Sequence, residues 1–391
     1  MRKLFPLVVF LLFISNVYAQ QIIQGTISDT SGQPISFISV SIKGMPVGTI
    51  SNDQGQFLLQ VRSFPDTLTF THLSYMPQQL VVTNSTPIKV ILQSQVIQLN
   101  EVSVGNPALT LIKLAADKAY KTAITPYLAK AFSRQIMTEA DKPAFFAENF
   151  LDVQWQNWGI TKYKITNARY LKRPDAVSYN NLTLLTYICS EFLKNTMLVT
   201  PINHQPDSLY KFKIKETFTN NGQQISVISC ALRDPDAKGF AFTGDIYINS
   251  DTYDVVKTEG TIHGLKMTLS GPYGAKLKEL KIMSQFKLDD KGNNVLDYSS
   301  FVLTYDMKVL GLVAKTLNYS STLFILNYDP TINPASLTNI DPNTKVNDEE
   351  MIKKIPYDPV FWKNNPVIRR TQADDDAITF LEGLKKQEGN Y

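Results

Sequence analysis

The sequence is poor in the residues from which metal and redox centres are built. It contains two cysteines and three histidines among 391 residues. Zinc peptidases need closely spaced His and Glu ligands together with a general base. None of His72, His204 and His263 stands in a His-x-x-Glu or His-Glu-x-x-His arrangement. We therefore expect no metal site and no cofactor.

The sequence also lacks the local signatures of other enzyme classes. It has no Gly-x-Ser-x-Gly elbow and no Gly-rich phosphate-binding loop. We therefore name no catalytic residue. A Ser/His/Asp triad can be assembled from distant positions in a chain, so a hydrolase stays as an alternative hypothesis.

An excess of charge of one sign is missing as well. The chain has 39 Lys and Arg against 35 Asp and Glu, a formal charge of +4. Removing residues 1–19 takes away Arg2 and Lys3, which leaves 37 against 35, or +2. This balance gives no electrostatic footprint for nucleic acid, and we expect no nucleic-acid partner.

One long apolar run is present, and it lies at the N-terminus. Residues 1–19 carry two basic residues, an apolar stretch over 4–14 and a small-residue cleavage site at Val17-Tyr18-Ala19. This pattern predicts a signal peptide and a mature chain that begins at Gln20 in the periplasm, at the outer membrane or outside the cell. An uncleaved anchor is the alternative, although the run is short for a span of about 20 apolar residues. After cleavage we expect no integral membrane protein.

The two cysteines, Cys189 and Cys230, have two interpretations. In an oxidising compartment they can pair as a disulfide. Each also lies in an apolar run, which fits two buried thiols equally well. The sequence leaves this choice open.

Residues 24–61 carry the most specific pattern in the chain. Short β-branched and aromatic runs alternate there with turns, of which Asn52-Asp53-Gln54-Gly55 is the clearest. Asp can bond its own backbone in such a turn, and Gly supplies a positive φ. Strands of this length between close turns predict an all-β sandwich.

The order of these residues resembles the carboxypeptidase-regulatory-like domain, a transthyretin-like β-sandwich found in envelope proteins of Bacteroidetes-type bacteria. The resemblance covers residues 22–104 and rests on Gly25, Asp29, Gly32, Pro34-Ile35, Val40, Lys43-Gly44, Gly48-Thr49, Ser51-Asn52-Asp53, Gly55, Phe57 and Leu59. Ser51-Asn52 departs from the Thr-Asp that is usual in the family. The resemblance implies a seven-stranded sandwich that accompanies a working domain, and it implies no reaction.

The remaining chain predicts a helix followed by a β-rich domain. Residues 108–123 carry apolar residues at helical spacing, and a hairpin turn is expected at 139–143. Strand candidates then follow one another at residues 212–218, 224–232, 241–249, 253–262, 277–288, 296–309 and 316–327. A meander of this kind predicts a large curved antiparallel sheet or half-barrel.

Residues 242–256 resemble a hairpin of half-barrel envelope proteins of the lipoprotein-carrier type. Residues 132–135 and 357–362 look similar to Bacteroidetes proteins that place a regulatory-like module before a domain of unknown role. In a carrier, the concave face of the sheet would hold an apolar ligand. A concave face filled by the helix at residue 108 would instead favour a docking role.

Two groups of residues are candidates for contact with a ligand. The aromatic cluster around Trp155 and Trp158 is either a sugar-binding platform or hydrophobic core. The concave face supplies the second group. The candidate ligand-facing residues are Trp155, Trp158, Phe301, Leu303, Leu323 and Ile325.

The tail ends in an amphipathic pattern. Residues 371–386 predict a short helix with Ile378, Leu381 and Leu384 aligned. Asp374-Asp375-Asp376 is either a cation site or a set of acidic residues that complement the N-terminal dipole of this helix.

Taken together, these patterns predict a mainly β protein, a β-sandwich plus an α+β part. We expect a signal peptide over residues 1–19, a sandwich over 20–105, a half-barrel-like domain over 106–330 and a surface-running tail over 331–391. The predicted function is that of a non-catalytic cell-envelope protein that binds or docks an outer-membrane protein partner, or an apolar or glycan ligand. A periplasmic carrier of a lipid is the first alternative and a hydrolase the second.

Overall fold

A computed structural model describes residues 21–45, 48–95, 97–98, 106–122, 124–156, 158–176, 198–220, 222–234, 240–264, 273–289, 291–340, 348–365 and 367–387. The chain divides into two compact units, Met1–Ser94 with Phe361–Thr371 and Gln95–Val360 with Gln372–Tyr391. The predicted signal peptide and Cys189 lie outside the described residues. The domain boundaries expected after residues 19, 105 and 330 stay predictions.

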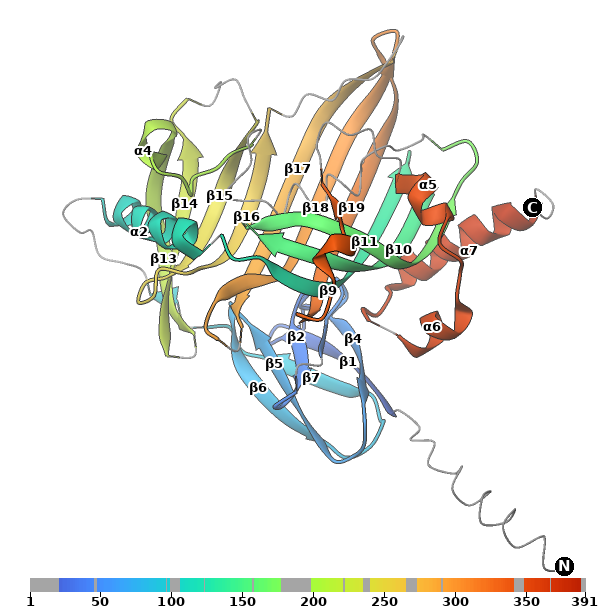
Figure 1. The fold of residues 1–391 in the computed structure, drawn as a ribbon, viewed down its shortest axis with the longest axis horizontal. Helices are drawn as coiled ribbons and strands as arrows, with labels where there is room; N and C mark the ends of the chain where they lie inside the picture. Colours follow the sequence, from blue (N-terminus) through green and yellow to red (C-terminus); the bar gives the residue numbers. More distant parts are fainter. Residues whose placement is uncertain are drawn as a thin grey trace, which may run out of the picture. The chain divides into compact units, whose positions relative to one another are not determined.

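The first unit is a sandwich of two β-sheets (Figure 1). One sheet has the strand order β4-β1-β7 and the other has the order β3-β2-β5-β6. The strands are β1 (Gln21–Asp29), β2 (Ser39–Ile42), β3 (Gly48–Ile50), β4 (Gln56–Val61), β5 (Asp66–His72), β6 (Tyr75–Val82) and β7 (Ile88–Leu92). Side chains of both sheets share one core, in which the rings of Phe57 and Phe70 meet edge to face at 5.7 Å. The seven-stranded sandwich predicted from the sequence is confirmed.

Asn52 organises the turn that leads into β4. Its Oδ1 accepts hydrogen bonds from the backbone N–H groups of Gln54 and Gln56, at 3.0 and 2.9 Å. Gly55 follows with φ at +69°, and a Cβ there would lie 2.2 Å from the carbonyl oxygen of Ile27. Only Gly fits this position, because both the backbone conformation and the space exclude a side chain.

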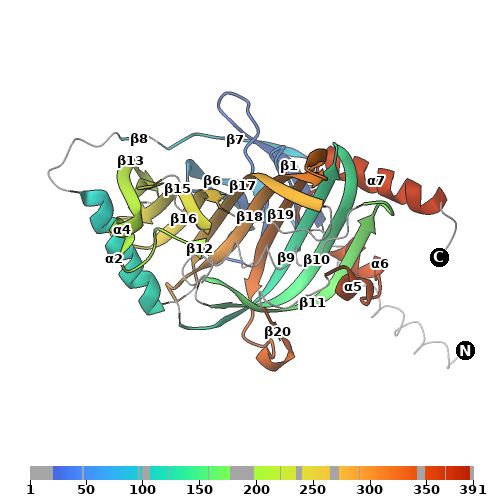
Figure 2. The same cartoon turned by 90° about the horizontal axis from the view of Figure 1, so that it is seen from above.

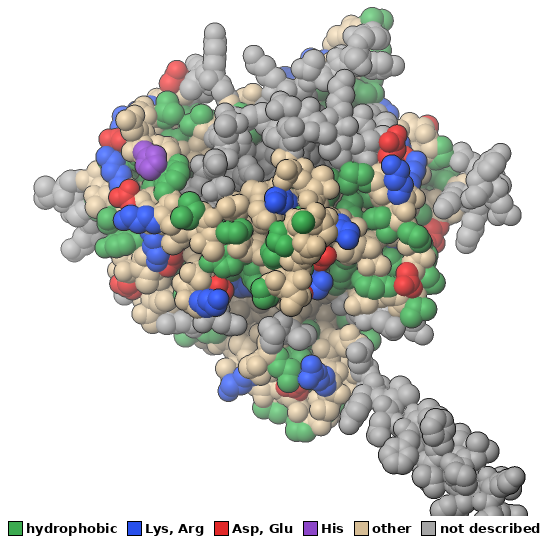
Figure 3. All heavy atoms as spheres, viewed as in Figure 1, with side chains coloured by type: hydrophobic (Ala, Val, Ile, Leu, Met, Phe, Trp, Pro, Cys, Tyr) green, Lys and Arg blue, Asp and Glu red, His purple; other side chains and the backbone are tan. Residues whose placement is uncertain are grey.

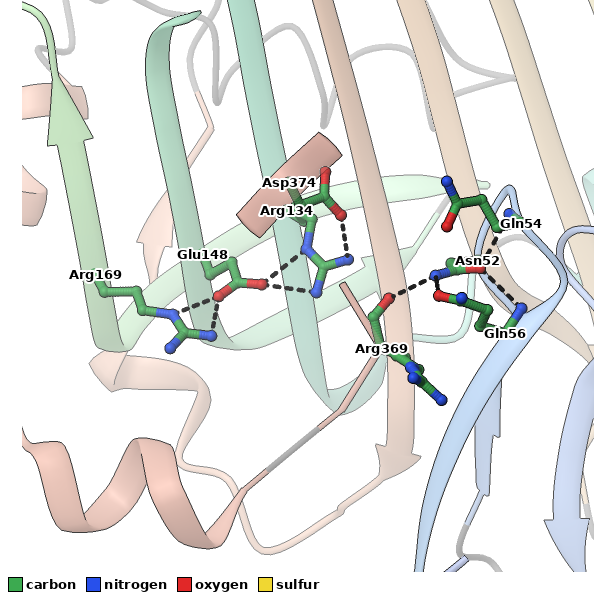
Figure 4. Close-up of polar contacts among 8 residues, drawn as sticks. All are labelled: Asn52, Gln54, Gln56, Arg134, Glu148, Arg169, Arg369 and Asp374. Atoms are coloured by element: carbon green, nitrogen blue, oxygen red, sulfur yellow. Dashed lines mark hydrogen bonds and ion pairs between the residues drawn. The ribbon is translucent and has the colours of Figure 1, made fainter. Parts of the chain in front are cut away.

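A segment of the C-terminal tail, residues 361–371, belongs to this first unit, and we call it the C-terminal strap. Thr49 Oγ1 donates a hydrogen bond to the carbonyl of Val367. Asn52 Nδ2 donates to the carbonyl of Arg369 at 3.2 Å (Figure 4). Arg369 Nη1 in turn donates to Gln24 Oε1 at 3.3 Å. Asp, the usual residue of the family at position 52, could not form the bond to Arg369, because a carboxylate has no N–H to donate. The Asn of this chain therefore permits a contact with the C-terminal strap.

The second unit is built on one 13-stranded sheet. Its strand order is β20-β11-β10-β9-β19-β18-β17-β16-β15-β14-β13-β8, and β12 pairs with β15. The strands are β8 (Ile97–Gln98), β9 (Tyr127–Glu139), β10 (Lys142–Gln156), β11 (Gly159–Lys172), β12 (Leu198–Val199), β13 (Tyr210–Asn220), β14 (Gln223–Leu232), β15 (Phe240–Asn249), β16 (Val255–His263), β17 (Tyr273–Leu288), β18 (Asn294–Val309), β19 (Leu312–Tyr328) and β20 (Thr338–Asn339). Figures 1 and 2 show the long strands β17 to β19 near the middle of this curved sheet. The large curved antiparallel sheet predicted from the sequence is confirmed.

The two faces of this sheet carry different side chains. On β18, Phe301 and Leu303 are buried in the main hydrophobic core, whereas Ser300 and Val302 alternate with them. We call the first face the inner face and the second the outer face, because successive residues of a strand point to opposite sides. Helix α2 (Pro107–Thr122) confirms the helix expected over residues 108–123, and it packs into the core of the inner face. Its buried residues are Ala108, Ile112, Ala115, Ala116 and Ala119.

The remaining helices are α4 (Pro206–Leu209), η1 (Pro334–Ser336), α5 (Asp348–Lys353), α6 (Pro359–Asn364) and α7 (Gln372–Gln387). The amphipathic helix expected at the end of the tail is confirmed by α7, which buries Ala377 and Leu381. It packs against β10 and β11. Within the described parts of the chain, every helix is too short or too polar to cross a membrane.

Candidate binding groove

A groove of about 660 Å³ crosses the outer face of the sheet from β14 to β18. Two rows of side chains from neighbouring strands form its walls, and each row runs perpendicular to the strands. The first row consists of the successive cross-strand partners Thr243, Thr261, Lys281 and Val302. The second row consists of Asp245, Glu259, Met283 and Ser300. The register of the sheet therefore brings together residues that are far apart in sequence.

The floor of the groove is made by the backbone between the two rows. Ile282 and Phe301 turn their side chains to the inner face, and Gly244 and Gly260 have none. A Cβ on Gly260 would lie 2.1 Å from the carbonyl oxygen of Thr243 and 2.8 Å from Cα of Gly244. Strands β15 and β16 approach each other this closely because both positions are Gly.

The carboxylates of the groove are paired with lysines. Lys215 Nζ lies 2.7 Å from Asp245 Oδ2. Lys257 Nζ lies 2.7 Å from Glu259 Oε2, and the hydroxyl of Tyr247 donates to Glu259 Oε1 at 2.5 Å. The groove thus offers ion-paired charges, the hydroxyls of its Thr and Ser residues, and small apolar surfaces.

These pairs shift the ionisation of the groups involved. The hydrogen bond to Asp245 raises the pKa of Lys215. Burial acts to raise the pKa of Glu259, but the neighbouring Lys257 outweighs burial and the pKa is lowered. Burial, and then the hydrogen bond to Glu259, raises the pKa of the Tyr247 phenol. At neutral pH the groove therefore holds the ionised carboxylate of Glu259 beside the neutral phenol of Tyr247.

His263 lies at the end of the first row, where its Nε2 is 2.6 Å from Thr243 Oγ1. A hydroxyl beside an imidazole is the first half of a nucleophile and base arrangement, which also needs a group that orients the base. In the described chain, no hydrogen bond or ion pair joins His263 to a carboxylate. The ring of His204 stacks on Tyr120 with centroids 4.1 Å apart. A search of the same residues finds no group of three or more His, Cys, Asp or Glu that could hold a metal ion.

The six ligand-facing candidates named from the sequence all lie in the main hydrophobic core. Each is at most 2% exposed, namely Trp155, Trp158, Phe301, Leu303, Leu323 and Ile325. The ring centroids of Trp158 and Phe286 lie 4.6 Å apart. Of the six, Phe301 contributes to the groove. Their role in contacting a ligand stays a prediction.

Apart from Phe301, sequence reasoning did not single out the residues of the groove. Asp245, Glu259 and Lys281 lie on three different strands, and only the register places them together. One local signal was available, because Gly244 and Gly260 interrupt predicted strands. A Gly inside a strand often marks a site where another chain or ligand approaches the backbone closely.

The second wall row continues across the outer face to a buried ionic network. Ser300 pairs with Thr322, Thr322 with Arg134, and Arg134 with Glu148. The Glu148 side chain has no exposed surface and contacts Arg134 at 2.7 Å and Arg169 of β11 (Figure 4). Arg134 also lies 3.5 Å from Asp374 of α7. Asp374 therefore helps to hold α7 on the outer face, beyond the end of the groove.

The sequence matches two family models. Residues 23–104 match the CarboxypepD_reg-like domain, and residues 144–323 match a family of unknown function, DUF5686. The TonB-dependent receptor SusC of Bacteroides thetaiotaomicron is 33% identical over 106 residues, which are 27% of this chain and 10% of the receptor. The chain thus spans about a tenth of that receptor.

Solved structures with some similarity include a LolA superfamily protein from Nitrosomonas europaea. It is 11% identical, the alignment covers 58% of this chain and 95% of that one, and the TM-score is 0.22. A DUF1329 family protein from Desulfovibrio piger is 9% identical, with 59% and 97% covered and a TM-score of 0.24. TM-scores this low carry no inference about what this chain binds. Along the chain, a segment that matches the CarboxypepD_reg-like model is thus followed by a segment that matches the DUF5686 model.

Proposed function

We propose that this chain is a non-catalytic cell-envelope protein that binds a polar partner in the groove of its second unit. The N-terminal sandwich would serve as a docking or spacer module. The proposal rests on one observation, which is that packed side chains fill the inner face of the large sheet. Leu303 and Leu323 have no exposed surface and share one core with Ala115 of α2. The groove, in contrast, lies on the polar outer face.

The walls of the groove favour a polar partner over an acyl chain. They present three hydroxyls, two ion-paired carboxylates and one lysine, and an apolar ligand would displace water from these groups without replacing its hydrogen bonds. A glycan, or a protein segment rich in polar side chains, can replace that water with hydrogen bonds. The similarity of 106 residues to part of a TonB-dependent receptor supports a partner that is a receptor of the cell envelope.

Native mass spectrometry of the chain, purified gently from its own envelope, tests the proposal. We expect a protein or glycan partner and no stoichiometric lipid. The double variant Lys281→Glu and Val302→Asp should lose this partner. Both side chains are exposed, 61% for Lys281 and 41% for the Val302 residue, so the fold should tolerate the change.

Lys164→Glu is the matched control, because Lys164 is exposed on β11 at the far end of the same sheet. The control should keep the partner. One acyl-bearing lipid per chain would instead support the carrier. A partner that the groove variant retains would place its binding site elsewhere on the molecule.

A further inference from the structure

The hairpin between β18 and β19 ends in an apolar tip. Leu310 is 82% exposed, Leu312 is 77% exposed and Val313 is 56% exposed. In Figure 1 the two strands project at the top of the second unit, and Figure 3 shows hydrophobic side chains at this end. Single exposed apolar residues are ordinary, but three at one projecting tip are not.

The two residues of the turn depart from the amino-acid preferences of two-residue β-turns. Leu310 and Gly311 connect the strands, and both have positive φ, at +50° and +84°. A two-residue turn of this kind favours Asn-Gly or Asp-Gly, because Leu fits positive φ poorly. The β13–β14 connection of the same sheet has Asn221-Gly222 in its sequence. Sequence rules broken without a local compensation point to function.

Lysines stand directly behind the tip. Lys308 comes two residues before Leu310, which is about 7 Å along a strand. Its neighbour on β17 is Gly274, and Lys276 follows two residues further along that strand. In the described chain, no ion pair joins Lys276 or Lys308 to a carboxylate. The apolar tip therefore has a basic collar, in which one carboxylate, Asp306, lies across from Lys276 and pairs with Lys278.

We propose that this hairpin tip is a membrane-contact site. Leu310, Leu312 and Val313 would enter the acyl region of a bilayer, and Lys276 and Lys308 would contact the phosphates of anionic lipids. The combination of an apolar end and a cationic base matches the layered chemistry of a bilayer surface. A narrow tip is a poor protein interface, which needs about 800 Å² on each partner.

The backbone of the tip suits this environment. Val309 and Leu312 pair across the hairpin, so the turn leaves few backbone groups without a partner. Unpaired backbone groups are what a bilayer tolerates least. A tight hairpin can therefore enter the headgroup region where an open loop could not.

Co-sedimentation with lipid vesicles tests the site. The full chain should sediment with vesicles of phosphatidylethanolamine and phosphatidylglycerol, and less with phosphatidylcholine alone or at high salt. The double variant Leu310→Asn and Leu312→Thr should lower binding about tenfold or more, since two apolar side chains leave the bilayer. The variant introduces the favoured Asn-Gly turn and places a β-branched residue, Thr, in the strand.

Two further variants distinguish vesicle binding by the tip from non-specific binding by exposed apolar side chains. Leu288→Thr removes an apolar side chain that is 49% exposed at the other end of β17, and this variant should bind like the native chain. Lys276→Gln with Lys308→Gln should weaken binding to anionic vesicles and leave a smaller dependence on salt.

Two results would overturn the proposal. One is a native chain that binds none of these vesicles. The other is a tip variant that binds them as strongly as the native chain. Sedimentation velocity provides a further check, because self-association lost in the tip variant would assign the tip to a contact between copies of this chain.

Discussion

Arg134 and Glu148 are direct cross-strand partners on β9 and β10, and Nε and Nη2 of Arg134 both lie 2.7 Å from Glu148 Oε1. Glu148 is fully buried and its second oxygen contacts Arg169. Two guanidinium groups and two carboxylates, the second from Asp374, thus balance one another on the outer face. A buried charge is tolerated only with such partners.

Replacing Glu148 with Gln should destabilise the second unit by about 3 kcal/mol, because Arg134 and Arg169 lose the charge that compensates them. Urea unfolding followed by tryptophan fluorescence measures the change. Asp152→Asn on the same strand is the control. Its partner Lys130 is 49% exposed, so we expect a change of at most about 1 kcal/mol. Equal effects of the two substitutions would contradict the structural role of the network.

Gly260→Ala should destabilise the second unit by about 2 kcal/mol, since the added Cβ forces β15 and β16 apart. Gly274→Ala is the matched substitution, because the nearest atom to a Cβ there is 3.7 Å away. It should leave the stability unchanged or slightly increased. The melting temperatures of the two variants, measured by thermal unfolding, test this expectation. Equal melting temperatures would show that the close approach of β15 and β16 has no effect on stability.

Acid should weaken the attachment of α5 through Glu349. Burial acts to raise the pKa of this carboxyl, but its bonds to Lys353, Lys172 and Tyr170 outweigh burial and lower the pKa from 4.5 to about 2. A lowered folded-state pKa contributes stability above about pH 4.5, and this contribution is lost as the pH falls towards 2.

Urea unfolding at a series of pH values should therefore show a difference between the native chain and Glu349→Gln at pH 7. The difference should shrink as the pH falls through this range. A difference that stays constant with pH would mean that the ionised carboxylate of Glu349 does not stabilise the fold.

Asn52→Asp should loosen the C-terminal strap and keep the turn. The carboxylate can still accept from Gln54 and Gln56, but it cannot donate to the carbonyl of Arg369. The lost bond is worth about 1 kcal/mol, which corresponds to roughly fivefold faster tryptic cleavage at Arg369 and Arg370. Asn84→Asp is the control, since Asn84 caps an exposed turn through its acceptor oxygen alone. Unchanged cleavage in Asn52→Asp would contradict the assigned hydrogen bond.

Cys230 should be unreactive in the folded chain. It is buried, and burial raises the pKa of its thiol well above the ordinary value. In the variant Cys189→Ser, a thiol reagent should react at least about a hundredfold more slowly before unfolding than after it. The native chain, unfolded without reductant, then answers the open question of pairing. Two reactive thiols exclude a disulfide, and none establishes it.

The sequence predicted those parts of the fold that local chemistry determines. The turn at Asn52 and Gly55 specifies its own geometry through side-chain acceptors and positive φ, and the sandwich was predicted from it. The strands after Tyr210 were predicted because strand-forming runs follow one another there, separated by turn residues such as Asn221-Gly222. Pairing of Asp245 with Glu259, in contrast, depends on the register between two strands, which no local pattern encodes.

Among the strands after Tyr210, the two largest differences from the predicted boundaries are at the starts of β17 and β19. Strand β19 was expected to begin at residue 316 and begins at Leu312, because Leu310-Gly311 has no Asn or Asp to signal a turn. Strand β17 was expected from residue 277 and begins at Tyr273. On β10, Phe146 and Phe150 of the outer face are buried, and so are Ala147 and Leu151 of the inner face. A strand buried on both sides loses the alternation from which a face is assigned.

The C-terminal strap makes the first unit discontinuous in sequence. The chain leaves this unit after Ser94 and returns to it for residues 361–371. A gene fragment that encodes only residues 20–105 would therefore transfer a sandwich in which Gln24, Thr49 and Asn52 have lost their hydrogen bonds to the C-terminal strap. The same fragment with residues 361–371 joined to it would keep these three bonds, so the strap is the part of the tail that a transplant of the sandwich has to include.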